Sequence, residues 1–280
     1  MKKVAVLIRV YDRIEDLKYN LQIIKDLWNN NDYDVFVSSN GKSSGYKIDD
    51  ETSKNIFKLI ELEENAGHLK GNSQLLLEGC KNIPFDNYDY LIILEADTWI
   101  MDDSIITKYI KNLDSSQNVW ASAEWVESRH SLAVDFAIIK SKFIKEYYSH
   151  LFDFTTKAEM WIAENLNEMK KEFTYINEFM PIHRPSAVKS IYNADEGRLR
   201  VFPLAKTVTH HIENLEGGMD KKKELANLVS KSNYFENKKN SSDLSYYLYI
   251  LLQFSLRSVP RSSWIKKKKT TFNLETKELV

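Results

Sequence analysis

The residues most able to do chemistry are two carboxylates, Glu95 and Asp97, which directly follow the apolar run at residues 91–94. Four consecutive large aliphatic residues predict a short strand buried on both faces, as in a parallel sheet covered by helices. Side chains two residues apart in an extended chain share a face, so both carboxylates should point one way from the strand's carboxyl end, where open α/β sheets bind ligands. Two oxygen ligands there suit Mg²⁺ or Mn²⁺ bridging substrate phosphates, although a strand that simply reaches water also turns polar.

The elements that must position these carboxylates follow from alternating apolar patterns. Strands are expected at residues 4–10, 34–39, 57–62 and 91–94, with helical patterns between them. Asp12 is expected to cap the first helix, with Glu15 as its capping-box partner. Strands that alternate with helices favour right-handed βαβ units, so we expect an α/β fold with a mainly parallel sheet flanked by helices.

The second half of the chain keeps its strands but loses the regular alternation. Strands are expected at residues 119–123 and 133–139, and helices carry the apolar positions of 143–151 and 158–169. No linker separates the halves, which predicts one domain over residues 1–240, built from the lobes 1–115 and 116–240, and a terminal segment at 241–280.

Composition excludes some classes of function. The net charge of −1, from 39 basic and 40 acidic residues, provides no overall basic field for nucleic acid. Cys80 is the single cysteine, so no intrachain disulfide can form, and a reducing, cytoplasmic location is expected. No run of about 20 apolar residues exists, and no membrane span is expected.

Several short motifs together resemble the nucleotide-sugar half of GT-A glycosyltransferases, above all the large family 2. They are residues 4–12, the Asn40-Gly41 turn, the loop 65–72 and Glu95-Ala96-Asp97, in the family's order and spacing. The resemblance covers residues 3–165 and, loosely, the remainder. It implies a GT-A-type sheet, a nucleoside-diphosphate sugar donor bound by residues 1–115, a Mn²⁺ or Mg²⁺ cofactor, and an acceptor bound mainly by a mixed half at 116–240.

The resemblance assigns the two acids and the diphosphate loop to donor binding. Asp97 takes the position of the acid that coordinates the metal. Glu95 takes the position of the first acid, usually Asp, which contacts the ribose or, through water, the metal. Lys70, with Asn72 close by in sequence, lies where the family often has a basic residue near the diphosphate; an ordinary surface lysine is the alternative.

The nucleobase end is assigned in the same way. The turn running from Arg9 through Tyr11 to Asp12 would flank the base. Where the family commonly has consecutive acids, this chain has Ser39 and Asn40. The Asn40 amide oxygen can still accept a hydrogen bond from a base N–H. The departure leaves the identity of the base open.

An inverting transferase needs a group that takes the proton of the acceptor hydroxyl. Glu159 fills the family's position for this base at the start of a helix, where the helix dipole alone also favours a carboxylate. Asp135 is the rival base, because an acid inside an apolar strand needs a reason, although it can equally be a hydrogen-bonded core acid. His210 and His211 are candidates for a further metal ligand, and adjacent strand residues face opposite ways, so at most one should reach the ion.

The function favoured by these residues is metal-dependent transfer of a sugar from a nucleoside diphosphate to a glycan or lipid-linked glycan, with inversion. A sugar-1-phosphate nucleotidyltransferase is one alternative, but it normally carries a glycine-rich loop after the first strand, and residues 9–13 contain no glycine. The second alternative is a catalytically silent scaffold that binds glycan or nucleotide. Glu95 and Ser39-Asn40 depart from the family's usual residues, and these departures support that alternative.

The C-terminal segment suggests a membrane surface as a partner. Residues 244–256 are very apolar, and Arg257, Arg261, Trp264 and the lysines at 266–269 follow. An apolar, then aromatic, then cationic order suits a helix lying against anionic lipid, here on the inner face of the membrane. The alternative is a final helix packed on the domain and followed by a solvated basic tail.

Overall fold

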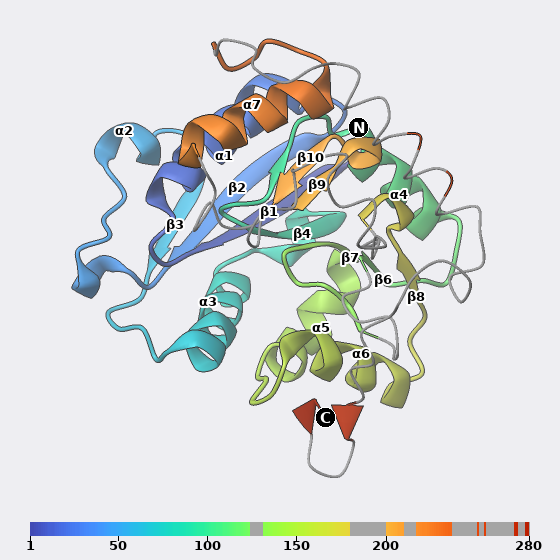
Figure 1. Ribbon diagram of the computed structural model, residues 1–280. Helices are drawn as coiled ribbons and strands as arrows, with labels where there is room; N and C mark the ends of the chain where they lie inside the picture. The colour runs from blue at the N-terminus through green and yellow to red at the C-terminus, as the bar shows by residue number, and fades with distance from the viewer. Residues whose placement is uncertain are drawn as a thin grey trace.

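The computed structural model describes residues 1–123, 131–179, 200–209 and 217–236, together with 251, 255, 272–273 and 278–279. Its main sheet is built from β1 (Lys3–Val10), β2 (Asp32–Ser39), β3 (Lys58–Glu61), β4 (Tyr90–Glu95), β6 (Trp120–Ser122), β7 (Phe136–Lys140) and β8 (Phe173–Tyr175). The strand order is β3-β2-β1-β4-β7-β6-β8 (Figure 1). β7 runs antiparallel to both neighbours, and the remaining pairs are parallel.

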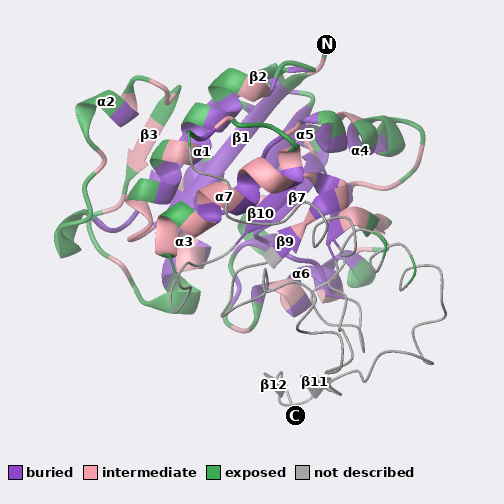
Figure 2. Cartoon of the chain, turned by 45° about the horizontal axis from the view of Figure 1, so that its top comes forward, coloured by how far each residue is buried: buried purple, intermediate pink, exposed green. Residues whose placement is uncertain are grey.

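The sheet is buried on both faces by helices. α1 (Ile14–Leu27) and α4 (Ser104–Asp114) cover one face, and α3 (His68–Lys81), α5 (Ser141–Leu151) and α6 (Ala158–Glu168) cover the other. A short α2 (Asp50–Ser53) precedes β3. In Figure 2 the central strands are buried, whereas the outward faces of α2, α3 and α4 are exposed. The predicted fold class is therefore confirmed as α/β, with a mainly parallel central sheet flanked by helices.

The apolar run that predicted a doubly buried strand is divided evenly between the two cores. In β4, Ile92 and Leu94 pack into the core under α1 and α4, and Leu91 and Ile93 pack into the core under α3 and α5. All four side chains are fully buried. β4 is thus packed on both faces, and this packing fixes the position of its carboxyl end relative to the neighbouring strands.

A second, smaller sheet joins the late part of the chain to the middle. It consists of β5 (Trp99–Ile100), β10 (Thr207–Thr209) and β9 (Arg200–Phe202), with antiparallel β10 in the centre. α7 (Gly218–Ser230) packs on it and also contacts Ile23 of α1. A two-stranded pair, β11 (Phe272–Asn273) and β12 (Glu278–Leu279), completes the described elements.

Two local expectations are wrong. β7 begins at Phe136, three residues later than the apolar pattern suggested, so Asp135 precedes the strand instead of lying inside it. Asp12 does not cap α1: the cap residue is Arg13, because the first helical hydrogen bond runs from Leu17 N–H to the Arg13 carbonyl, and no side chain caps the helix. The Asp12 carboxylate instead lies 3.5 Å from Nε of Arg13. No helix in the described ranges is long and apolar enough to cross a bilayer.

Candidate active site

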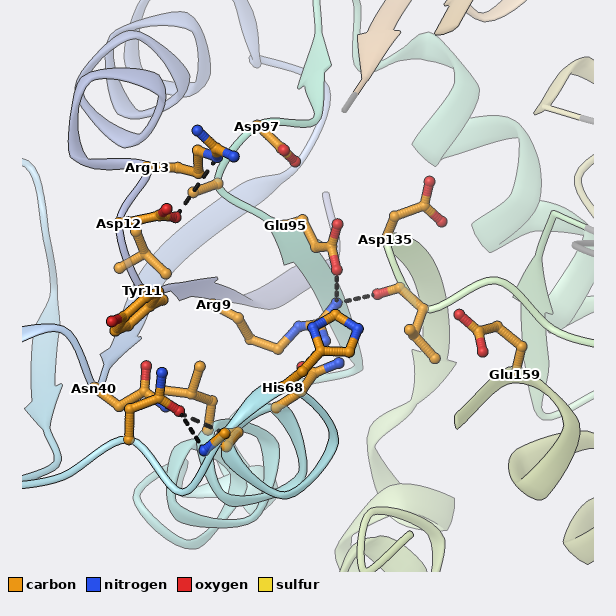
Figure 3. Close-up of a pocket in the computed structure, with 18 residues that line it drawn as sticks. Arg9, Tyr11, Asp12, Arg13, Asn40, His68, Glu95, Asp97, Asp135 and Glu159 are labelled. Carbon is orange, nitrogen blue, oxygen red and sulfur yellow. Dashed lines mark hydrogen bonds and ion pairs between the residues drawn. The ribbon is translucent and has the colours of Figure 1, made fainter. Parts of the chain in front are cut away.

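A cleft of about 440 Å³ opens at the edge of the sheet where the parallel strands end (Figure 3). β7 runs the opposite way, so its first residues meet the carboxyl end of β4: the Glu95 N–H donates to the Asp135 carbonyl at 2.9 Å. The reversed direction of β7 thereby brings one more carboxylate, that of Asp135, to the edge where the parallel strands end. The cleft is lined by Arg9, Val10, Tyr11, Asp12, Arg13, Asn40, Asn65, Gly67, His68, Gly71, Asn72, Leu75, Glu95, Ala96, Asp97, Val134, Asp135 and Glu159.

The two predicted acids lie on a tight turn, not on one face of a strand. β4 ends at Glu95, and the Thr98 N–H donates to the Glu95 carbonyl at 3.0 Å, which closes a turn over residues 95–98. We call these four residues the acid turn. The expected alternation of side chains therefore stops at Glu95, and the turn geometry sets the direction of Asp97. Both acids still line the cleft, with the Asp97 side chain 3% exposed.

Arg9 lies beneath the cleft and holds Glu95. Its guanidinium Nη2 is 3.3 Å from Oε1 of Glu95 and also donates to the Val134 carbonyl. Nη1 donates to the Asn72 side chain on α3. Arg9 is 4% exposed, so these contacts compensate the burial of its charge. The arrangement orients Glu95, and it ties Asn72 to the acid side of the cleft.

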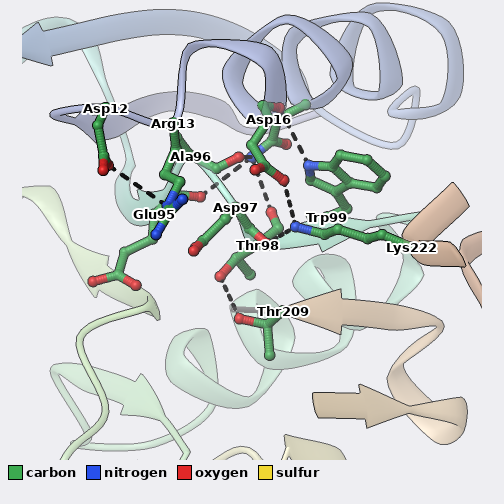
Figure 4. Close-up of polar contacts among 11 residues, drawn as sticks. Asp12, Arg13, Asp16, Glu95, Ala96, Asp97, Thr98, Trp99, Thr209 and Lys222 are labelled. Atoms are coloured by element: carbon green, nitrogen blue, oxygen red, sulfur yellow. Dashed lines mark hydrogen bonds and ion pairs between the residues drawn. The ribbon is translucent and has the colours of Figure 1, made fainter. Parts of the chain in front are cut away.

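The carbonyl groups of the acid turn are held by side chains from distant helices (Figure 4). Nδ2 of the buried Asn20 on α1 lies 3.3 Å, 3.1 Å and 2.9 Å from the carbonyl oxygens of Glu95, Ala96 and Thr98. The remaining carbonyl, that of Asp97, accepts a hydrogen bond from Lys222 of α7. Every backbone acceptor of the turn is therefore fixed.

The opposite end of the cleft has the chemistry of an amide-lined pocket. Asn40 follows β2 and is 1% exposed. Its Nδ2 donates to Oδ1 of Asn65 at 3.3 Å and to the Gly71 carbonyl at 3.4 Å. With the amide so oriented, its Oδ1 has no hydrogen-bond partner among the described residues. A buried acceptor in the cleft wall suits an N–H group of a ligand.

Two further carboxylates, those of Asp135 and Glu159, stand across the cleft from Glu95 in Figure 3. Glu159 is in the first turn of α6, and its side chain is partly buried. Burial raises the pKa of Glu159, and the negative charges of Glu95 and Asp135 raise it further. Asp135 is 8% exposed, and its Oδ1 accepts the Phe136 N–H at 3.1 Å. Both candidate bases thus reach the same cleft.

Some predicted residues lie elsewhere or outside the described ranges. Lys70 is exposed on α3 and is not among the residues lining the cleft. His210 and His211 fall outside the described residues. Thr209, which precedes them, is buried, and its Oγ1 lies 2.7 Å from Oγ1 of Thr98 in the acid turn.

Sequence reasoning missed the side chains that hold the acid turn, although a signal for them exists. Asn20 lies on the apolar stripe of α1, three residues after Leu17. Lys222 lies on the apolar stripe of α7, three residues before Leu225 and seven before Val229. A polar residue at a core position of an amphipathic helix must find a buried partner, so its presence points to a polar contact inside the fold. Arg13, Asn65 and His68 of the cleft lining were also missed.

The side chains of Asp97 and Glu95 can serve as oxygen ligands for a divalent ion. Among the described residues, no group of three or more His, Cys, Asp or Glu side chains is placed to hold a metal. Mg²⁺ in nucleotide sites is usually bound through one or two carboxylates plus substrate phosphates and water. Asp97 and Glu95 can supply the carboxylates from the lining of the cleft. Their carboxylate oxygens are of the kind that bind Mg²⁺ or Mn²⁺.

Comparison with known proteins shows likeness at the level of structure. No family model and no curated protein matches the chain. A mannosyltransferase from Pyrobaculum calidifontis, solved with GDP-Man and Mn²⁺, is 15% identical with a TM-score of 0.47; the match covers 62% of this chain and 54% of that one. The chain thus spans about half the length of that protein. A 4-diphosphocytidyl-2C-methyl-D-erythritol synthase from Anaerococcus prevotii is 10% identical with a TM-score of 0.42, over 62% of this chain and 85% of that one.

Proposed function

We propose that the cleft binds a nucleoside-diphosphate sugar with a divalent ion and transfers the sugar, with inversion, to a glycan or lipid-linked glycan. The observation that carries this proposal is the convergence of Glu95, Asp97, Asp135 and Glu159 in one cleft. Like charges repel, so a fold that gathers these carboxylates, with Asp12 also in the lining, at one edge supports a site for a cation and for proton transfer. That edge is also where open α/β sheets place their ligands.

The donor would lie across the cleft from the amide pocket to the acid turn. Asn40 offers its Oδ1 to an N–H of the nucleobase, and Tyr11, which lies edge-on to Tyr46, offers an aromatic face. Asp97 would hold the metal, with Glu95 directed by Arg9 towards the ribose or a metal-bound water. A divalent ion bound there offsets the charge that develops on the leaving diphosphate. Arg13 in the same wall adds a fixed positive charge.

Glu159 is the proposed base for the acceptor hydroxyl. A base works best when its pKa is close to the working pH, and the environment of Glu159 raises its pKa in that direction. Asp135 stays the second candidate, although one of its oxygens already accepts the Phe136 N–H. The acceptor would enter between α6 and the start of β7, where both carboxylates face the cleft.

A nucleotide panel tests donor binding. Melting temperatures are measured with UDP, GDP, CDP and ADP, each with and without Mn²⁺, for the wild type and Asp97→Asn. The matching nucleotide at about 100 times its dissociation constant should stabilise the wild type by about 2.7 kcal/mol. The part of this stabilisation that depends on Mn²⁺ should be lost in Asp97→Asn, because the other acid of the motif, Glu95, is already paired with Arg9.

Asp86→Asn is the matched control, since Asp86 is an exposed acid paired with Lys145 and does not line the cleft. An equal Mn²⁺-dependent stabilisation in the wild type and Asp97→Asn would contradict the metal assignment. Mn²⁺-dependent hydrolysis of a nucleotide sugar would separate an enzyme from a silent scaffold. Release of pyrophosphate from a nucleoside triphosphate and a sugar 1-phosphate would instead indicate the nucleotidyltransferase.

A further inference from the structure

Lys222 is a fully buried charged residue on the apolar face of α7. Its side chain is fully buried, and Nζ lies 2.5 Å from Oδ1 of Asp16 and 4.3 Å from the centroid of the Trp99 ring. Replacing a buried ion pair with apolar side chains of similar size is often neutral or stabilising. The neighbours Leu225 and Val229 already form an apolar core on the same face of α7. The lysine therefore calls for an explanation beyond packing.

The third contact of Lys222 is to the acid turn. Nζ donates to the Asp97 carbonyl oxygen at 2.7 Å (Figure 4). A peptide unit is planar, so fixing its carbonyl oxygen fixes the orientation of the whole unit. Asn20 fixes the peptide unit before Asp97 through the Ala96 carbonyl, and Lys222 fixes the unit after it. With both flanking units held, the direction of the Cα–Cβ bond of Asp97 is determined.

We propose that Lys222 is a positioning residue for the acid turn: its ammonium group holds the Asp97 carbonyl, and thereby aims the Asp97 carboxylate at the metal–diphosphate position. The consequence for metal binding rests on the proposed function. The contact between Thr98 and Thr209 supports it, because a second residue from the late part of the chain is bound to the same turn. α7 and β10 together thus brace a turn that lies more than 100 residues earlier.

The test variant is the double substitution Asp16→Asn with Lys222→Met. Lys222→Met alone would leave the buried carboxylate of Asp16 without its cation and could unfold the protein for that reason. The double variant removes both charges, so the lost hydrogen bond to Asp97 remains as the main change. Asp16→Asn alone keeps that bond and serves as the first control.

Lys223→Met is the matched control on the next residue of α7. Lys223 also lies over an aromatic ring, that of Tyr19, at 4.1 Å from its centroid, and donates to the Tyr19 hydroxyl at 2.6 Å. It makes no contact with the acid turn among those recorded for the described residues. The Lys223→Met variant therefore measures how far weaker packing of α7 alone changes the exchange of the Thr98 amide and the Mn²⁺ affinity.

Two readouts are taken. The first is hydrogen exchange of the Thr98 amide, whose hydrogen bond to the Glu95 carbonyl closes the acid turn. The second is Mn²⁺ affinity by electron paramagnetic resonance, for Mn²⁺ alone and with UDP or GDP. We expect faster exchange and an affinity for Mn²⁺ with nucleotide about 10-fold lower in the double variant, since groups that orient metal ligands affect affinity on this scale. Lys223→Met should behave as the wild type in both readouts. Asp16→Asn leaves the buried Lys222 ammonium without its anion and should lower the free energy of unfolding, but it keeps the hydrogen bond to Asp97 and should keep the wild-type Mn²⁺ affinity.

Unchanged exchange of the Thr98 amide in the folded double variant overturns the proposal, and so does a change of equal size in Lys223→Met. Faster exchange together with an unchanged Mn²⁺ affinity overturns the link to the metal. A wild type that binds no Mn²⁺ with either nucleotide counts against the proposed function. In that case the exchange comparison still decides whether Lys222 positions the turn.

Discussion

The surroundings of Glu159 are unfavourable to its own charge. Burial raises its pKa most, and the charges of Glu95 and Asp135 add to the effect. A backbone hydrogen bond at Glu159 itself and the cation of Arg9 oppose it. A carboxyl group whose pKa is raised on folding favours the protonated form. Its contribution to stability is therefore complete below the pKa of the unfolded chain and is lost as the pH rises through the raised, folded value. At neutral pH this residue lowers the stability of the fold, as groups at functional sites often do.

Glu159→Gln is expected to separate activity from stability. Turnover should fall by about 10²–10⁴-fold, the scale for loss of a general base, while nucleotide affinity is unchanged. The free energy of unfolding at pH 7 should equal or exceed that of the wild type, because the amide carries no charge to bury. That difference should shrink towards pH 4, where the wild-type carboxyl group is protonated in the folded state. Urea denaturation at both pH values measures it.

Glu168→Gln is the control for this substitution, since Glu168 is exposed on the same helix, α6. Near-normal turnover in Glu159→Gln would move the proposed base to Asp135. A variant that is less stable than the wild type at pH 7 would show that Glu159 makes a stabilising contact in its ionised form.

The ends of β1 and β2 meet at the Asn40 end of the cleft, where we propose that the nucleobase binds, and a glycine permits their approach. A Cβ atom at Gly41 would lie 2.1 Å from the Tyr11 carbonyl oxygen and 2.9 Å from Cβ of Tyr46. Such contacts cannot form, so the two loops would have to separate. At Gly71 on α3, a Cβ would come within 2.2 Å of Oδ1 of Asn65, so the Asn65 side chain would have to turn away. The amide pocket therefore depends on close packing of three elements.

Gly41→Ala should move the β1 and β2 loops apart. The expected cost is about 1–3 kcal/mol in the free energy of unfolding, as for other overpacked positions. Nucleotide binding should weaken as well, because Tyr11 and Asn40 would change their separation. Calorimetric titration and denaturant unfolding measure the two effects. Ser43→Ala changes an exposed position in the same loop and should alter neither the stability nor the nucleotide affinity. If Gly41→Ala bound nucleotide as tightly as the wild type, the nucleobase would have to bind elsewhere.

At the scale of the whole molecule, the late part of the chain completes a site that the first half begins. β10 pairs with β5 directly after the acid turn, and α7 packs across β5 and α1. The proposed division keeps residues 1–240 as one unit, since α7 at 218–230 contacts the acid turn. Residues 241–280 form the proposed terminal segment, most of which lies outside the described residues. Either His210 or His211, but not both, stays a proposed metal ligand.

The terminal segment is predicted to bind anionic membranes. The basic residues between 257 and 269 should each contribute about 1 kcal/mol near such a surface, and salt should screen that contribution. We expect the protein to co-sediment with phosphatidylserine-containing vesicles at low salt and to be released at high salt. Removal of residues 257–280 should weaken the binding and leave nucleotide binding unchanged. A full-length protein that stays in the supernatant at low salt would rule out this segment as a membrane anchor.

The sequence by itself determined the elements and the edge at which the chemistry lies. The apolar runs of β1 and β4 and the stripes of α1, α3 and α5 could be predicted because burial leaves a periodic pattern in neighbouring residues. Only the tertiary structure decided which polar groups meet. It turned Arg9 towards Glu95, brought Asp135 to the site through the reversal of β7, and joined Lys222 to an aspartate 206 residues away. Periodicity records which face of an element is buried, but the partner of a buried polar group depends on how distant elements pack.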